Sequence, residues 1–90
     1  MTDDVRYARN TEILTGQSGT ETFMMHAETG VYFALNETAT RVWQILDEPR
    51  TQADIVSALV AEYRVDAVRC QAEMGPFLAD LVARDVLRTT

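Results

Sequence analysis

Two short apolar runs separated by a turn sequence place the strongest constraint on how this chain can fold. The runs are residues 22–26 (Thr-Phe-Met-Met-His) and 31–35 (Val-Tyr-Phe-Ala-Leu), with Ala-Glu-Thr-Gly between them. This pattern is typical of a β-hairpin. We expect a loop of residues 28–30 in which Gly30 takes the left-handed conformation, because glycine has no Cβ to clash there.

This loop predicts three antiparallel pairs: Ala27 with Val31, Met25 with Phe33, and Phe23 with Leu35. Side chains alternate between the two faces of a strand, so the register decides which residues are buried. One face is then wholly apolar and is expected to face the core: Phe23, Met25, Val31, Phe33 and Leu35. The other face carries Met24, His26, Tyr32 and Ala34, and we expect His26 to face solvent.

The chain before the hairpin gives weaker signals. Residues 1–10 are polar and charged, which is typical either of a frayed, disordered end or of the lead-in to a first strand. Residues 12–15 (Glu-Ile-Leu-Thr) are a weak strand candidate, and the two glycines in residues 16–19 indicate a turn. The expected sheet is therefore antiparallel and three-stranded, or a hairpin alone.

Three helices are predicted after the hairpin, each beginning at a polar capping residue. Asn36, Thr51 and Asp66 can accept hydrogen bonds from the first turn of a helix, and Asp54 gives Thr51 a near capping box. Pro49 ends the first helix because proline disfavours helical geometry in the residue before it. Apolar residues recur at helical spacing: Ala39, Val42, Trp43 and Leu46, then Ile55, Val56, Leu59 and Tyr63, then Cys70, Met74, Phe77, Leu78, Leu81 and Val82.

The third helix contains Gly75-Pro76, where we expect a kink rather than an end because the apolar spacing continues. Val86 and Leu87 are expected to pack back on the sheet. Strands followed by three helices predict an α+β fold that is winged helix-turn-helix-like, with the sheet at the N-terminus. Ninety residues make a single domain, residues 1–90.

The sequence offers little for catalysis. It contains one histidine, His26, and one cysteine, Cys70, and no third group is evident that would orient such a pair. Cys70 lies at a core position of its helix. There is no Cys-x-x-Cys, no pair of histidines and no glycine-rich phosphate loop. We therefore expect no enzymatic activity, no metal and no cofactor.

Charge and composition argue against nucleic-acid binding, secretion and insertion into a membrane. The formal net charge is −6, and the 8 basic residues are all arginine, which opposes binding to nucleic acid. The single cysteine is typical of a reducing compartment, and no apolar run reaches the length of a signal or membrane-spanning segment. These features predict a cytoplasmic protein that does not bind membranes.

Residues 31–35 have a further property if they form the last strand of the sheet. Exposed strand edges pair with other chains, and proteins usually block them with lysine, proline or a bulge. Val-Tyr-Phe-Ala-Leu contains no lysine or proline. Such an edge can receive an extended peptide. It can equally be covered by another part of the chain or form a dimer contact.

The sequence also resembles a known protein family. Residues 28–37 (Glu-Thr-Gly-Val-Tyr-Phe-Ala-Leu-Asn-Glu) are similar to the hairpin-to-helix signature of the PqqD family. The resemblance extends through residues 41–47, 51–56, 59–66, 77–84 and 86–87, and so covers about residues 20–88. The individual motifs are loose, and their order and spacing carry the resemblance.

The resemblance implies a peptide-recognition element for ribosomally synthesised, post-translationally modified peptides. Such domains bind the leader segment of a precursor peptide as a strand added to the sheet, against the third helix, and present it to an enzyme. In pyrroloquinoline quinone biosynthesis that partner is a radical SAM enzyme, and in lasso-peptide biosynthesis it is a leader peptidase. The sequence does not decide between these pathways.

Carried over to this chain, the resemblance implies a peptide-binding site on the strand and on one stripe of the third helix. The strand residues are Val31, Tyr32, Phe33, Ala34 and Leu35, and the helix residues are Ala67, Cys70, Gln71, Met74 and Leu78. Cys70, Met74 and Leu78 are equally well explained as core. Two departures from the family stand out: Asp85, where members often carry glycine, and Pro76, where a helix former is usual.

Three functions remain open at this stage. The first is a non-catalytic chaperone for a leader peptide. The second is a winged-helix nucleic-acid binder, which the acidic charge opposes. The third is a small homodimerisation module that uses the same strand edge.

Overall fold

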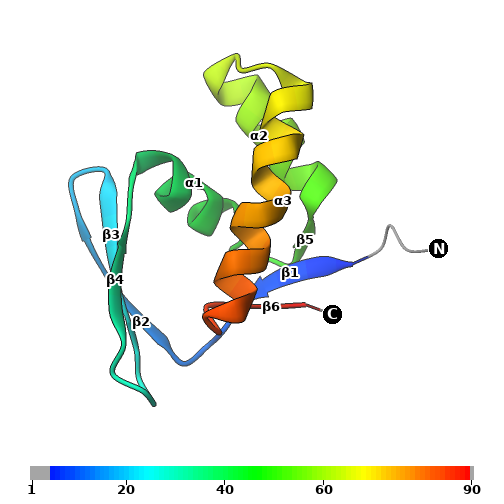
Figure 1. Ribbon diagram of the computed structural model, residues 1–90. Helices are drawn as coiled ribbons and strands as arrows, with labels where there is room; N and C mark the ends of the chain where they lie inside the picture. The colour runs from blue at the N-terminus through cyan, green and yellow to red at the C-terminus, as the bar shows by residue number, and fades with distance from the viewer. Residues whose placement is uncertain (1–4, 90) are drawn as a thin grey trace.

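The computed structural model describes residues 5–89 and confirms an α+β fold in which an N-terminal sheet is followed by helices (Figure 1). Two antiparallel sheets, with strand orders β2-β3-β4 and β5-β1-β6, pack with three helices over these residues. The elements are β1 Arg6–Arg9, β2 Ile13–Ser18, β3 Glu21–His26, β4 Tyr32–Leu35, α1 Glu37–Ile45, β5 Arg50–Thr51, α2 Gln52–Tyr63, α3 Ala67–Ala83 and β6 Leu87–Thr89.

All three helices begin where the capping residues predict. The Asn36 side chain accepts from the Ala39 N–H at 2.9 Å, and the Asp66 side chain caps α3 in the same way. Thr51 and Asp54 form a complete capping box, with hydrogen bonds of 3.1 and 3.2 Å. Because Asn36 directly follows β4, the strand passes into α1 without a loop. This tight junction places the start of α1 at one end of β4.

Helix α3 runs without interruption through Pro76. Beside it, Gly75 packs against the side chain of Gln52, which also donates from Nε2 to the Gln71 carbonyl at 3.2 Å. The helix ends at Ala83, and Asp85 then takes a positive φ of 62°. This left-handed conformation favours glycine, which explains why glycine is usual there in the family that the sequence resembles.

The predicted register of the hairpin is wrong by one residue. Met24 pairs with Phe33 and Met25 with Tyr32, and the His26 N–H donates to the Val31 carbonyl at 2.9 Å. The loop therefore begins at Ala27 and is one residue longer than expected, although Gly30 has the predicted positive φ, at 74°. A one-residue shift moves every side chain of β3 to the opposite face of the sheet.

The shift corrects the predicted core. Phe33 and Leu35 face inward as expected, but on β3 the inward residues are Met24 and His26 rather than Phe23 and Met25. His26 is 3% exposed and not in solvent. Val31, which was expected in the core, is exposed.

The second sheet was not foreseen. Residues 1–10 were expected to be either a frayed end or the lead-in to a first strand, but Arg6–Arg9 themselves form the central strand of this sheet. Residues 1–4 lie outside the described part of the chain. Val86 and Leu87 are buried as expected, but β6 pairs with β1 rather than with the hairpin sheet. The turn expected in residues 16–19 begins later, because β2 continues to Ser18.

Candidate functional site

Strand β4 forms one edge of its sheet and pairs only with β3 among residues 5–89. Because the His26 N–H donates to the Val31 carbonyl, His26 and Val31 are a hydrogen-bonded pair of the antiparallel ladder between β3 and β4. Bonded and non-bonded pairs alternate along an antiparallel ladder, so Phe33 and Leu35 exchange bonds with β3. The N–H and C=O groups of Tyr32 and Ala34 therefore point away from β3, towards the open edge.

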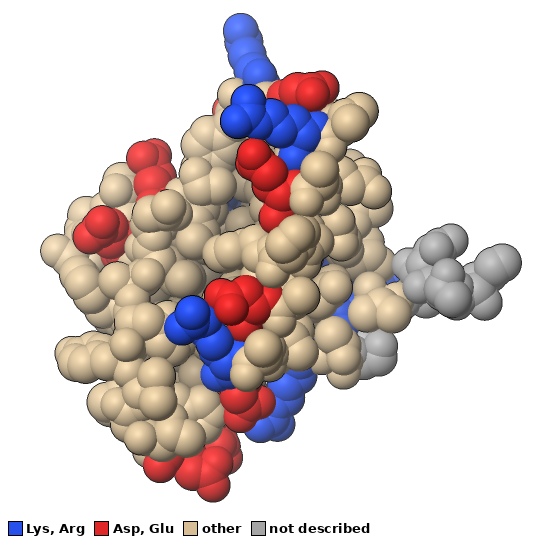
Figure 2. Space-filling model, in the orientation of Figure 1, with Lys and Arg blue, Asp and Glu red and all other residues tan. Residues whose placement is uncertain are grey.

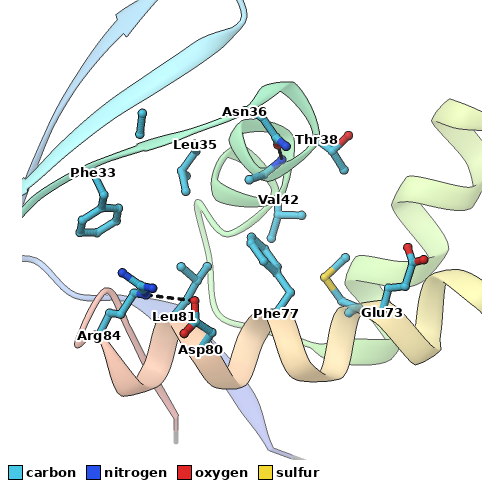
Figure 3. Close-up of a pocket in the computed structure, with 13 residues that line it drawn as sticks. Phe33, Leu35, Asn36, Thr38, Val42, Glu73, Phe77, Asp80, Leu81 and Arg84 are labelled. Atoms are coloured by element: carbon cyan, nitrogen blue, oxygen red, sulfur yellow. Dashed lines mark hydrogen bonds and ion pairs between the residues drawn. The ribbon is translucent and has the colours of Figure 1, made fainter.

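A groove of about 480 Å³ runs between this edge and α3 (Figure 3). β4 contributes Phe33, Ala34 and Leu35 to one side. The start of α1 closes the groove with Asn36, Thr38, Ala39 and Val42. The opposite side is one face of α3 and carries Glu73, Met74, Phe77, Asp80, Leu81 and Arg84.

The floor of the groove is apolar. Leu35, Val42, Met74 and Leu81 are buried, and Phe77 is half-buried with its ring directed into the groove towards Val42 (Figure 3). The α3 residues recur at intervals of three and four, so they share one face of the helix. An extended segment lying beside β4 would meet apolar side chains from three elements.

Each charged group that lines the rim of the groove has a partner of opposite charge. Asp80 accepts from Arg84 Nε at 3.0 Å, and Glu73 accepts from Arg69 Nε at 3.2 Å. All four side chains are exposed, so these pairs contribute little to stability and can exchange partners. The rim can therefore meet a charge of either sign on a bound segment.

Comparison with known proteins gives a family and two similar structures. The model of the family described as coenzyme PQQ synthesis protein D (PqqD) matches residues 21–87. The chain belongs to the PqqD family. A search of the curated proteins gives no match.

Two solved structures that resemble this PqqD-family chain are complexes with a leader peptide. TbiB1 in complex with the TbiA(beta) leader peptide is 28% identical, with a TM-score of 0.83, over 90% of this chain and 94% of that one. A lasso peptide synthetase B1 complexed with the leader peptide is 22% identical, with a TM-score of 0.79, over 91% and 96%. The second likeness concerns the fold alone.

Only part of the helix stripe predicted for the PqqD-family site lines the groove beside β4. Met74 does, whereas Ala67 and Gln71 are exposed outside it and Leu78 is fully buried in the core. Cys70 lines an adjoining pocket with Leu59, Tyr63 and Val65, and this pocket shares Thr38, Glu73 and Met74 with the groove. Of the strand residues, Phe33, Ala34 and Leu35 line the groove, and Tyr32 and Val31 are exposed beside it.

The contact between α2 and α3 explains this placement. Gln52 on α2 bonds to Gln71 and lies against Gly75, so α2 covers the side of α3 that includes Leu78. The face of α3 that α2 leaves uncovered carries Phe77, Leu81 and Arg84. The predicted site did not include these three residues. Phe77 and Leu81 were visible in the sequence as apolar positions, but spacing alone does not say which apolar stripe another helix covers.

His26 and Cys70 do not form a catalytic pair. His26 Nδ1 accepts from the N–H groups of Glu28 and Thr29, at 3.2 and 3.4 Å, and Nε2 bonds to Asp85 at 3.0 Å. Neither ring nitrogen is thus free to activate a thiol. Burial, followed by the charge of Glu73, raises the pKa of Cys70 and so disfavours its nucleophilic thiolate.

The structure also brings together three side chains that the sequence did not connect. Ligand atoms of Glu12, His26 and Glu28 lie within 4.8 Å of one another. The imidazole lone pair on Nδ1 already accepts the two loop N–H groups. Metal binding would have to break these bonds, so this cluster is not assigned as a metal site.

Six of the eight arginines contact an acidic group or an aromatic ring in the part of the chain that the structure describes. Arg41, Arg50, Arg69, Arg84 and Arg88 each bond to a carboxylate. Arg9 lies over the Trp43 ring, 4.7 Å from its centre. In Figure 2 most of the visible basic groups lie next to acidic ones. This arrangement, like the net charge, opposes nucleic-acid binding. Within residues 5–89, no helix combines the length and apolar character that a membrane span needs.

Proposed function

We propose that this domain binds the leader segment of a ribosomally made precursor peptide by strand addition to β4, and presents it to a modifying or processing enzyme. The observation that carries the proposal is the open edge of β4 beside an apolar groove. The family and the leader peptides named in the two similar structures support it.

The open edge supplies the affinity that does not depend on peptide sequence. Tyr32 and Ala34 offer two N–H donors and two C=O acceptors to an incoming strand. Each hydrogen bond formed contributes about 0.5–1.5 kcal/mol net. An extended peptide of almost any composition can form them, so these bonds alone do not select a leader.

Selection comes from the side chains of the peptide. Neighbouring strands share their faces, so peptide residues aligned with Phe33 and Leu35 face the groove and the alternate residues face outward. The groove floor of Leu35, Val42 and Leu81 favours apolar side chains at every second position of the leader. The leader is therefore expected to contain an alternating apolar segment.

The domain has no catalytic role in this proposal. Both ring nitrogens of its only histidine are engaged, and its only cysteine is buried with a raised pKa. Chemistry on the precursor then belongs to a partner enzyme, such as a radical SAM protein or a leader peptidase. The domain supplies binding and orientation to that enzyme.

The decisive experiment uses fluorescence anisotropy to titrate the chain with the leader segment of a candidate precursor, chosen from any short reading frames found next to its gene. We expect a dissociation constant that is micromolar or tighter. Ala34→Pro should weaken binding at least about tenfold, because it removes one N–H from the open edge and spares the bonds between β3 and β4.

Ala34→Ser is the matched control, since it keeps the backbone N–H at the same exposed position. Circular dichroism should show that both variants are folded. Equal leader affinity of the proline and serine variants, or no binding by the wild-type chain, would contradict the proposal.

A further inference from the structure

His26 is a buried histidine at the end of β3 that lies among carboxylates. Its Nε2 is 3.0 Å from the Asp85 carboxylate, and one carboxylate oxygen each of Glu12 and Glu28 lies within 4.8 Å of a ring nitrogen. Arg88, on β6, approaches Asp85 at 3.7 Å. Three acids therefore meet at this ring, from the segment before β2, the hairpin loop and the residues that follow α3.

The imidazole holds the hairpin loop through hydrogen bonds that a protonated ring cannot accept. The N–H groups of Glu28 and Thr29 both donate to Nδ1, at 3.2 and 3.4 Å. Nδ1 has a free lone pair only in the neutral ring, because both nitrogens of a histidine cation are donors. When His26 takes up a proton at Nδ1, two loop N–H groups lose their acceptor at once.

The surrounding acids give the protonated ring a second arrangement. Glu12 and Glu28 are exposed, so their side chains can turn, and a cationic ring can donate from Nδ1 to either carboxylate. The bond from Nε2 to Asp85 is available in both arrangements. The loop thus has one set of partners with a neutral ring and another with a charged ring. Histidine is the side chain that ordinarily changes its charge between about pH 5 and 8.

We infer that proton uptake by His26 is a pH-sensitive switch that loosens the hairpin loop and lowers the affinity of β4 for the leader. The second half of this inference rests on the proposed function, because it takes the leader as the ligand of β4. The first half concerns the loop alone and can be measured without any peptide.

The loop reaches the open edge of β4 through very few residues. The His26 N–H donates to the Val31 carbonyl at 2.9 Å, and Tyr32 follows directly with its N–H and C=O directed to the open edge. Ala34, which also presents its N–H and C=O there, lies near the start of α1 instead. A loosened loop therefore disturbs the Tyr32 end of the edge and spares the Ala34 end. By linkage, a leader that orders this edge also disfavours proton uptake by His26.

The first experiment follows the full chain by NMR between about pH 8 and 5, without a leader. We expect the amide signals of Glu28 and Thr29 to shift, and their protection from hydrogen exchange to fall, with the same midpoint as the His26 ring. Amide protection that stays unchanged while the ring titrates would overturn the inference. A ring that takes up no proton in this range would also overturn it.

The second experiment compares leader affinity by fluorescence anisotropy at about pH 7.5 and 5.5. Wild type should bind about three- to tenfold more weakly at the lower pH, as expected for the loss of edge hydrogen bonds. His26→Asn is the matched variant, because its Oδ1 can accept the loop N–H groups in place of Nδ1 but takes up no proton. Its affinity should be equal at both pH values, which also controls for titration of the leader itself.

A second variant keeps the test open if His26→Asn does not fold. Glu12→Gln combined with Glu28→Gln changes two exposed side chains and leaves every hydrogen bond of the His26 ring in place. The double variant should need a lower pH for the loop change, because its protonated ring has lost two carboxylates. An unchanged midpoint would overturn the inference, as would equal pH responses of wild type and His26→Asn. Failure of wild type to bind the leader at either pH is a different result, which removes the proposed function and leaves the NMR result standing.

Discussion

His26 Nε2 and an oxygen of the Asp85 carboxylate lie 3.0 Å apart, although the two residues are 59 positions apart in the sequence. His26 ends β3 at the start of the hairpin loop, and Asp85 follows the end of α3. The bond thus connects the sheet that contains β4 with the end of α3, and the groove lies between these two parts of the fold. Asn10 reinforces it by donating from Nδ2 to the Asp85 carbonyl at 2.7 Å.

The hydrogen bonds of His26 define its tautomer. Nδ1 accepts from two backbone N–H groups, so the ring proton is on Nε2 and is donated to Asp85. Replacing His26 by phenylalanine keeps a ring in the core but leaves the N–H groups of Glu28 and Thr29 without their acceptor. We expect a loss of about 1–3 kcal/mol in the free energy of unfolding, measured by urea denaturation.

Glu28→Gln is the control for this substitution, because it changes an exposed side chain in the same loop and keeps its backbone N–H. Its stability should remain within about 0.5 kcal/mol of wild type. A His26→Phe variant as stable as Glu28→Gln would show that the loop does not depend on the imidazole.

Asp85 makes stability depend on acid pH. The hydrogen bond from His26, and then the charge of Arg88, lower the pKa of the Asp85 carboxyl from its ordinary 3.8. A lowered pKa in the folded state means that the unfolded chain binds the proton more readily. This contribution to stability is complete above the unfolded pKa and is lost as the pH falls through the lower folded value.

Asp85→Asn should therefore remove the contribution of this carboxyl to the pH dependence of stability. Thermal unfolding between about pH 2 and 7 would show a shallower fall in Tm for the variant than for wild type at the acid end. Asparagine also tolerates the left-handed conformation at this position. Parallel Tm curves for the two proteins would mean that Asp85 is not stabilised in the folded state.

The sequence predicted those features of the fold that depend on residues close together in the chain. Asn36, Thr51 and Asp66 cap their helices through bonds within three residues, and all three were predicted. His26 was misplaced because its partner lies 59 residues away, and its burial shifts the hairpin register. The β5-β1-β6 sheet was missed because it joins short strands from the two ends and the middle of the chain.

The left-handed conformation of Gly30 was predicted correctly from the local sequence alone. Its φ of 74° lies in the left-handed region, which a residue with a Cβ enters at a cost. Gly30→Ala should destabilise the domain by about 1–2 kcal/mol, read from urea denaturation. Gly16→Ala is the matched control, since Gly16 has no positive φ and a Cβ there meets no atom within 4 Å. Equal stability of the two variants would contradict a strained loop.

Phe77 and Leu78 are neighbours on α3 whose roles the sequence could not separate. Phe77 is half-buried in the groove, whereas Leu78 is fully buried on the side of the helix that faces the core. The difference arises because the packing of α2 turns one apolar stripe of α3 inward and leaves the other beside β4. Leu78 should therefore affect mainly the stability of the domain, and Phe77 mainly its affinity for the leader.

Leu78→Ala should lower the free energy of unfolding by about 2–5 kcal/mol, as expected for a cavity in a packed core. Phe77→Ala should cost less stability and weaken leader binding about tenfold, because its ring lines the groove. Urea denaturation and anisotropy on both variants measure the two effects, with the Leu78→Ala titration done at a temperature where that variant is folded. If folded Leu78→Ala loses leader affinity and Phe77→Ala does not, the leader contacts the stripe first predicted from the sequence, and α3 must be turned differently in the complex.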